Sequence, residues 1–274
     1  MSTQVIEQPE VILNDGARMP KLGQGVFLVP PEDARQLVET GIRAGYSAVD
    51  SAAFYRNEKG VGEAIRASGE RIFVTTKLWR DEQGGDKPRR AFERSFAELG
   101  LQSLDLYLIH WPAPSLDLYA ETWKALVELH DEGRVRSIGV SNFTMDHLKR
   151  IIDATGVTPA VNQVELHPGF QQRKLVEFHE EHGIVTTSWS PLGRGALLDH
   201  PLFAELGAKH DKTPAQVIIR WHLDRGLTVI PKASSGARLR ENLDVFDFRL
   251  DADDMERIAA LDGTSRIGPD PDSM

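Results

Sequence analysis

The chain has 274 residues, of which 41% are hydrophobic and 27% are charged, with a net charge of -9 and no cysteine. The lack of cysteine excludes disulfides, thiolate nucleophiles and cysteine-based zinc or iron–sulfur sites, and we expect no metal. The chain has no basic run of the kind that binds nucleic acid and no stretch near the ~18 consecutive apolar residues of a membrane span. Because the N-terminus shows no export signal, we expect a cytoplasmic protein.

Short apolar runs with the character of β-strands alternate along the chain with helical patterns. We expect residues 1–10 to be a flexible N-terminus and 11–19 to form a small hairpin, because Asp15-Gly16 tolerates the positive φ of tight turns. The expected buried strands cover 22–27, 48–50, 72–76, 104–109, 137–140, 160–164, 184–189 and 227–230. The expected helices begin at Pro30, span Glu58–Ser68, pass through Phe92 and then Trp123, follow Thr144, span Gln171–His182, follow Thr213, and span Ser235–Leu243 and Ala252–Leu261.

Strands that are apolar on both faces and separated by helices predict a buried parallel sheet. About eight such units over this length favour a single (β/α)₈ barrel, which we expect to span 11–274 behind the short hairpin. An open doubly wound sheet is the alternative, and it usually carries a G-x-G-x-x-G turn. Gly23-Gln24-Gly25 and Gly193-Arg194-Gly195 both lack the last glycine of that pattern.

Polar side chains follow the strands at the end where a barrel carries its active site. Three runs end at Asp50, Lys77 and His110, and Tyr55 follows five positions after Asp50. These residue types move or steer protons, so together they are candidates for acid–base chemistry. Each also has an ordinary structural role open to it, as a solvated strand end, a packing aromatic, a surface lysine or a core histidine.

Several motifs, in order along most of the chain, resemble those of the aldo-keto reductase superfamily. They are Gly45-Tyr46 with Asp50, Tyr55, Glu58 and Gly62; Thr76-Lys77-Leu78-Trp79; His110-Trp111-Pro112; Arg136-Ser137-Ile138-Gly139-Val140-Ser141-Asn142-Phe143; and Ile230-Pro231-Lys232 with Arg238, Glu241 and Asn242. The chain is particularly similar to the prokaryotic branch that includes 2,5-diketo-D-gluconate reductases.

This resemblance implies reduction of an aldehyde or ketone by hydride from NADPH, with Asp50, Tyr55, Lys77 and His110 as the catalytic residues. Tyr55 would protonate the carbonyl oxygen. An ordinary tyrosine has a pKa of about 10, and we expect the Lys77 ammonium to lower it. Asp50 would hold Lys77, and a neutral His110 would orient the substrate oxygen.

The resemblance also implies sites for the cofactor and the substrate. The residues expected to bind NADPH are Gly25, Val26, Ser141, Asn142, Gln163, Trp189, Ser190, Leu192, Lys232, Ser234, Arg238, Glu241 and Asn242. Those expected to bind the substrate are Phe27, Phe54, Trp79, His110 and Trp111. Ala233 stands where the family usually has a serine, which removes one contact to the cofactor phosphate.

Dicarbonyls, keto-sugars and small aldehydes remain open as substrates, and we expect a monomer. Two other classes of function also remain open. One is a lyase that uses Lys77 as a Schiff-base nucleophile. The other is a nicotinamide-binding sensor or partner subunit with weak activity, because a fold does not determine function.

Overall fold

Eight parallel strands form the centre of the computed structural model, which describes residues 8–274. They are β3 (Gln24–Gly25), β4 (Ala48–Asp50), β5 (Phe73–Leu78), β6 (Leu104–Ile109), β7 (Val135–Ser141), β8 (Val161–Glu165), β9 (Val185–Trp189) and β10 (Thr228–Val229). Neighbours in this order pair with one another, and parallel bridges from Leu22 to Val229 and from Gly25 to Lys232 join the two edges. The sheet therefore closes into the expected barrel, and the open doubly wound alternative is wrong.

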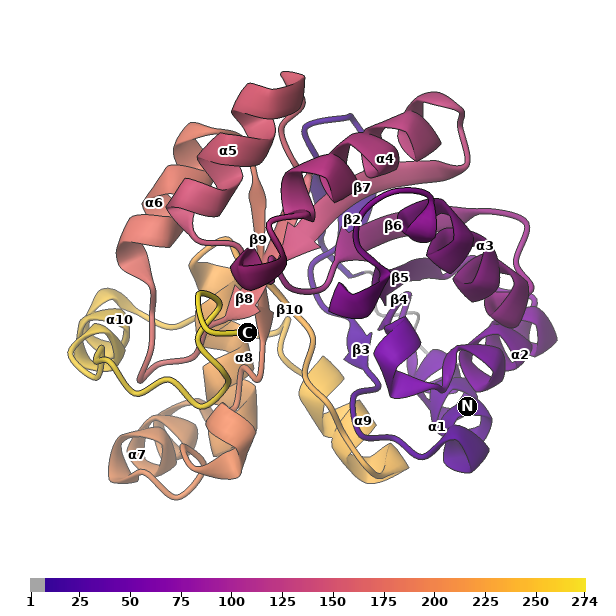
Figure 1. Cartoon of the computed structure of the whole chain (residues 1–274). Helices are drawn as coiled ribbons and strands as arrows, with labels where there is room; N and C mark the ends of the chain where they lie inside the picture. The colour runs from indigo at the N-terminus through magenta and orange to yellow at the C-terminus, as the bar shows by residue number, and fades with distance from the viewer. Residues whose placement is uncertain (1–7) are drawn as a thin grey trace.

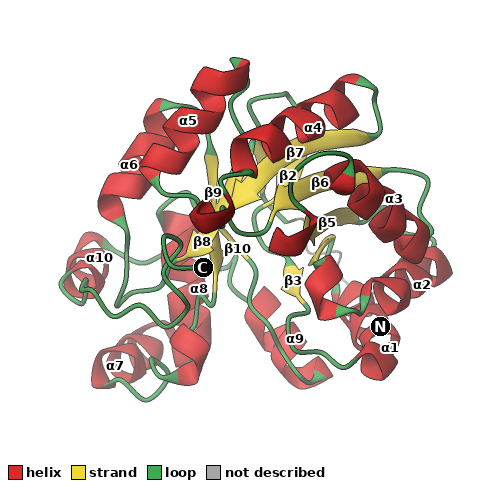
Figure 2. Cartoon of the chain, viewed as in Figure 1, coloured by secondary structure: helices red, strands yellow, loops and turns green. Residues whose placement is uncertain are grey.

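Helices surround the strands, as Figures 1 and 2 show. They are α1 (Pro31–Ala44), α2 (Glu58–Ser68), α3 (Lys87–Leu99), α4 (Tyr119–Asp131), α5 (Met145–Thr155), α6 (Arg173–Glu181), α7 (Pro201–His210), α8 (Pro214–Asp224), α9 (Gly236–Leu243) and α10 (Ala252–Ala259). Within the described residues 8–274, no helix combines the length and the apolar character needed to cross a membrane.

The N-terminal hairpin covers one end of the barrel. Strands β1 (Glu10–Ile12) and β2 (Arg18–Pro20) pair antiparallel around a turn in which Gly16 has a φ of 86°. Leu13 and Met19 pack in one buried cluster with residues that start or lie early in the barrel strands. The hairpin therefore closes the amino end of the strands and leaves the carboxyl end for the site. Strand β1 already begins at Glu10, and residues 1–7 of the predicted flexible terminus lie outside the described residues.

Close packing of α2 on α3 explains one glycine of the family-like motif. A Cβ atom at Gly62 would collide with the backbone oxygen of Leu99 at the end of α3. Only glycine lets the helices approach this closely without moving the backbone. Gly62 therefore has a packing role and positions the helices behind β4 and β5.

Helix α7 lies between β9 and α8, in a part of the chain for which the sequence analysis predicted no element. Pro201 stands at its first turn, and the side chain of His200 accepts a hydrogen bond from the Leu202 amide. Phe203 and Leu206 are fully buried in the cluster that α7 shares with α8. Proline at the first helical position was the available signal.

Candidate active site

The four predicted catalytic residues lie together at the carboxyl end of the strands. Asp50 ends β4, and its Oδ2 accepts a 2.7 Å hydrogen bond from Lys77 Nζ on β5. Tyr55 lies just beyond β4, with its ring centre 5.3 Å from Lys77 Nζ and 5.7 Å from the centre of the His110 ring. The four side chains thus lie close enough together to form one candidate site for acid–base chemistry.

The Asp50–Lys77 pair is buried and completed by two more hydrogen bonds. Lys77 is fully shielded from solvent and also donates to the Ser51 carbonyl at 2.8 Å. Gln163 Nε2 donates to Asp50 Oδ1 at 2.7 Å. Burial lowers the pKa of Lys77, while the charge and hydrogen bond of Asp50 oppose that change. Gln163, expected only to bind the cofactor, is therefore also part of the support for the ion pair.

The expected effect of Lys77 on Tyr55 was wrong for this structure. Burial, followed by the negative charge of Asp50, raises the pKa of Tyr55 well above its ordinary value. The positive charge of Lys77 is balanced by Asp50 at 2.7 Å, so it does not dominate the field at the phenol. Tyr55 is consequently protonated near neutral pH, which is the form that a proton donor needs.

His110 is neutral, as expected. Burial and the charge of Lys77 lower the pKa of His110 well below its ordinary value. Within the described part of the chain, its buried Nδ1 atom has no hydrogen-bond partner.

Hydrogen bonds link four of the residues predicted to bind NADPH. Trp189 Nε1 donates to Asn142 Oδ1 at 2.8 Å, and Asn142 Nδ2 donates to the His110 carbonyl at 3.0 Å. Ser141 Oγ donates to the Gln163 carbonyl at 2.8 Å. Asn142 has a φ of 65°, a left-handed conformation that asparagine tolerates better than most residues. These contacts join Asn142 to His110 and Trp189 to Asn142.

Aromatic side chains form a rim around Tyr55 and His110. Phe54 stacks on Trp79 with ring centres 3.9 Å apart, and Trp79 meets His110 edge-on at 5.2 Å. Phe27 lies 5.1 Å from Tyr55 between ring centres. Phe54 and Phe27 are 50% and 39% exposed, whereas the predicted substrate residue Trp111 is buried. The rim therefore offers an accessible apolar surface next to Tyr55.

The predicted phosphate-binding residues lie where β10 leads into α9. Lys232 pairs through its backbone with Gly25, and Ser235 caps α9 by accepting a hydrogen bond from the Arg238 amide. Lys232 and Arg238 are exposed, and neither forms an ion pair with another described residue. Two cations at a helix N-terminus suit an anion. Beside them lies a groove of about 310 Å³ that Lys232 and Ser234 share with the first turns of α1.

The other predicted cofactor residues have mixed surroundings. Gly25 and Val26 are buried beside β4, and Ser190 has a φ of 48° just after β9. Leu192 packs in the apolar cluster that includes α8 and α9 residues. Glu241 accepts a 2.7 Å hydrogen bond from Thr213 Oγ1, and Asn242 is buried, so both residues also help to join α9 to the barrel.

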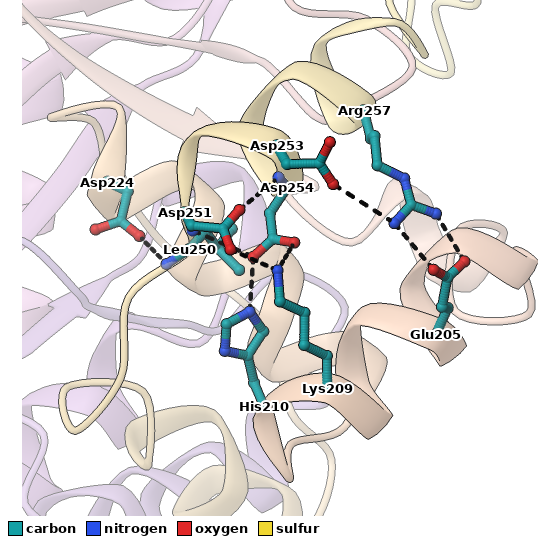
Figure 3. Close-up of polar contacts among 9 residues, drawn as sticks. All are labelled: Glu205, Lys209, His210, Asp224, Leu250, Asp251, Asp253, Asp254 and Arg257. Carbon is teal, nitrogen blue, oxygen red and sulfur yellow. Dashed lines mark hydrogen bonds and ion pairs between the residues drawn. The ribbon is translucent and has the colours of Figure 1, made fainter.

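A separate acidic cluster at the start of α10 is paired with residues of α7. Asp251, Asp253 and Asp254 lie close enough together to suggest a cation site. Figure 3 shows that the Lys209 ammonium lies between Asp251 and Asp254, donating to each at 2.6 Å, and His210 lies 2.7 Å from Asp254. Because a lysine already supplies the positive charge, this cluster is a structural link between α7 and α10.

Comparisons with known proteins agree with this geometry. Residues 21–263 match the profile of the aldo/keto reductase family. The chain is 49% identical over 270 residues to a methylglyoxal reductase, DkgA, from Escherichia coli strain K12, covering 96% of this chain and 98% of that protein. The crystal structure of the Gox0644 D53A mutant in complex with NADPH has a TM-score of 0.95 and 53% identity, covering 97% of this chain and 98% of the other. The crystal structure of an aldo/keto reductase from Brucella melitensis has a TM-score of 0.90 and 49% identity, and the match covers 93% of this chain and 100% of that one.

Proposed function

The chain belongs to the aldo/keto reductase family of oxidoreductases, and from this premise we propose that it reduces aldehydes and ketones with NADPH, using Tyr55 as the proton donor. The observation that carries the proposal is the meeting of a buried Asp50–Lys77 pair, a protonated Tyr55 and a neutral His110 at one end of the barrel. A bound reduced nicotinamide supplies the hydride that these side chains lack.

The residues present suit that cofactor. Lys232 and Arg238, with the backbone amides at the start of α9, favour the ribose 2′-phosphate that distinguishes NADPH from NADH. Trp189 and Asn142 lie beside His110, where the nicotinamide ring has to approach the substrate. One of the structural relatives was solved in complex with NADPH.

The side chains then divide the work on the carbonyl group. His110 donates a hydrogen bond that positions the carbonyl oxygen, and Tyr55 transfers its proton to that oxygen as negative charge develops. The Asp50–Lys77 pair remains paired and holds the floor of the site in place. Phe27, Phe54 and Trp79 exclude water and contact the apolar part of the substrate.

For the substrate, we favour small dicarbonyls of the methylglyoxal type together with aromatic aldehydes. A relative at 49% identity is named as a methylglyoxal reductase. The exposed faces of Phe54 and Phe27 add a surface on which a flat apolar group stacks.

The geometry disfavours the two alternatives. A Schiff-base nucleophile has to reach its substrate as a free amine, but Lys77 is fully buried and its Nζ is bound to Asp50 and Ser51. A sensor has no need for a complete set of proton-transferring residues. Keto-sugars stay open as a further class of substrate.

The test is consumption of NADPH, followed by its absorbance, with methylglyoxal, a keto-sugar and an aromatic aldehyde. We expect turnover with methylglyoxal and the aromatic aldehyde, and slower turnover with NADH. Failure of every carbonyl compound to oxidise NADPH, despite measurable NADPH binding, would support the sensor instead. Trapping of a substrate on Lys77 by borohydride would support the lyase.

A further inference from the structure

The carboxylate of Glu165 captures the C-terminal segment of the chain. Glu165 ends β8, and its side chain is completely buried. Its two oxygens accept hydrogen bonds from consecutive backbone amides, Ile267 N at 2.5 Å and Gly268 N at 2.7 Å. These amides lie about one hundred residues further along the chain, so the contact fixes the last segment over the carboxyl end of the barrel.

The environment of Glu165 keeps its carboxylate ionised. Burial alone would raise the pKa of Glu165, but His167 and the amides of Ile267 and Gly268 together outweigh it and lower the pKa. His167 Nε2 lies 3.2 Å from the same carboxylate. A buried carboxylate is costly unless hydrogen bonds satisfy it, so the C-terminal segment and Glu165 stabilise each other.

The C-terminal segment that Glu165 binds packs against Trp189. Glu165 and Trp189 are opposite one another in the pairing of β8 with β9. A Cβ atom at Gly268 would collide with Cη2 of Trp189 and lie 2.9 Å from Glu165 Oε2. Gly268 thus contacts the outer edge of the Trp189 indole ring. On the other side of the ring, the indole nitrogen of Trp189 donates a hydrogen bond to Asn142. The ring is held from two sides.

Beyond Gly268 the chain crosses the mouth of the barrel. Asp272 lies 3.4 Å from His147 Nε2 at the start of α5, and the sulfur of Met274 lies 4.0 Å from Arg80 after β5. In Figure 1 the C-terminus lies over the centre of the ring of helices. Glu165 is therefore the buried anchor at the beginning of a segment that ends next to Arg80.

We propose that Glu165 is a positioning residue of the reductase site: it fixes Gly268 against Trp189 and so holds the indole in the orientation that receives the nicotinamide. This inference rests on the proposed function. It differs from a purely stabilising role because it requires Glu165 and Gly268 to change cofactor binding through Trp189.

The experiment combines amide hydrogen exchange with NADPH titration of the full chain and two variants. Glu165→Gln replaces one acceptor oxygen by an NH₂ group that opposes a backbone N–H. Gly268→Ala keeps the carboxylate but adds the colliding methyl group. Gly263→Ala is the matched control, because a Cβ atom there would lie 3.5 Å from its nearest neighbour, an ordinary contact.

We expect Glu165→Gln to remove the exchange protection of the Ile267 and Gly268 amides. Both variants should weaken NADPH binding about tenfold, because each displaces Trp189 and so alters the cofactor site indirectly, while Gly263→Ala matches the wild type. The double variant should lose less than the product of the two single losses, since both changes disturb one contact. If Glu165→Gln does not fold, Gly268→Ala decides the question.

Unchanged NADPH affinity in a folded Glu165→Gln or Gly268→Ala protein would overturn the inference. So would full protection of the two amides in Glu165→Gln. Failure of the proposed function is a different result: the wild type would then oxidise NADPH with none of the carbonyl compounds, while the exchange data would still report whether Glu165 holds the segment.

Discussion

Lys77 Nζ lies 5.3 Å from the centre of the Tyr55 ring, yet the pKa of Tyr55 is raised. The reason is that Asp50 balances the lysine charge at 2.7 Å, and burial then disfavours the phenolate. The phenol of Tyr55 therefore stays protonated. This arrangement suits a reaction in which charge develops on the substrate oxygen and has to be met by a proton.

Replacement of Tyr55 by phenylalanine should abolish carbonyl reduction. The ring and its contact with Phe27 remain, but the proton is gone. We expect kcat to fall roughly 10²–10⁴-fold with the NADPH dissociation constant unchanged, measured by steady-state kinetics and by titration. Turnover within a few-fold of the wild type would show that another group supplies the proton.

The pH dependence of the hydride-transfer step should reflect the raised pKa of Tyr55. A proton donor is active below its pKa, so the rate should be level from about pH 6 to about pH 9 and fall only in strongly alkaline solution. Single-turnover measurements with methylglyoxal isolate this step. A decline that begins near neutral pH would mean that Lys77 lowers the pKa of Tyr55 after all.

Replacement of Lys77 by methionine should leave Asp50 buried without its cation. Breaking a buried ion pair costs about 3–5 kcal/mol, so both activity and melting temperature should fall at neutral pH. Lys59→Met, at an exposed position of α2, is the control. A melting temperature as high as that of Lys59→Met would contradict the role of the pair.

Arg238→Ala should weaken NADPH binding and leave NADH binding nearly unchanged. A charge-assisted hydrogen bond contributes about 1.5–3 kcal/mol, which corresponds to roughly tenfold to more than a hundredfold in affinity. Arg240→Ala removes the same charge from an exposed position of the same helix and is the matched control. Equal losses for both cofactors would place the 2′-phosphate elsewhere.

Asp254→Asn should weaken the link between α7 and α10 and so lower the stability of the fold. Burial tends to raise the pKa of Asp254, but hydrogen bonds from Lys209 and His210 outweigh it and lower the pKa. The stabilisation is therefore complete above the ordinary aspartate pKa of about 3.9 and is lost as the pH falls through the lower folded-state value.

The Asn variant should consequently melt a few degrees lower at neutral pH, since hydrogen bonds to charged groups contribute about 1.5–3 kcal/mol. The difference from the wild type should shrink below about pH 4. Asp253→Asn, whose side chain is 75% exposed on the same helix, should change little. A difference that persists unchanged in strong acid would show that charge is not the cause.

The sequence by itself predicted the barrel and the grouping of the four candidate catalytic residues. Alternating apolar runs and helical periods are local signals, and β6 was predicted with the bounds that the structure has, Leu104–Ile109. Asp50, Lys77 and His110 lie at or near strand ends, so the geometry of a parallel barrel brings them to one rim without further information.

Only the tertiary structure decided how those groups interact. The raised pKa of Tyr55 depends on burial and on how Asp50 balances Lys77, and neither is written in the spacing of the three residues. The hydrogen bond from Gln163 to Asp50 joins residues that are 113 positions apart in the chain. The hydrogen bond from Gly268 to Glu165 joins residues that are 103 positions apart. Strand and helix patterns arise from neighbouring residues, whereas burial and charge balance arise from whatever the closed barrel brings together.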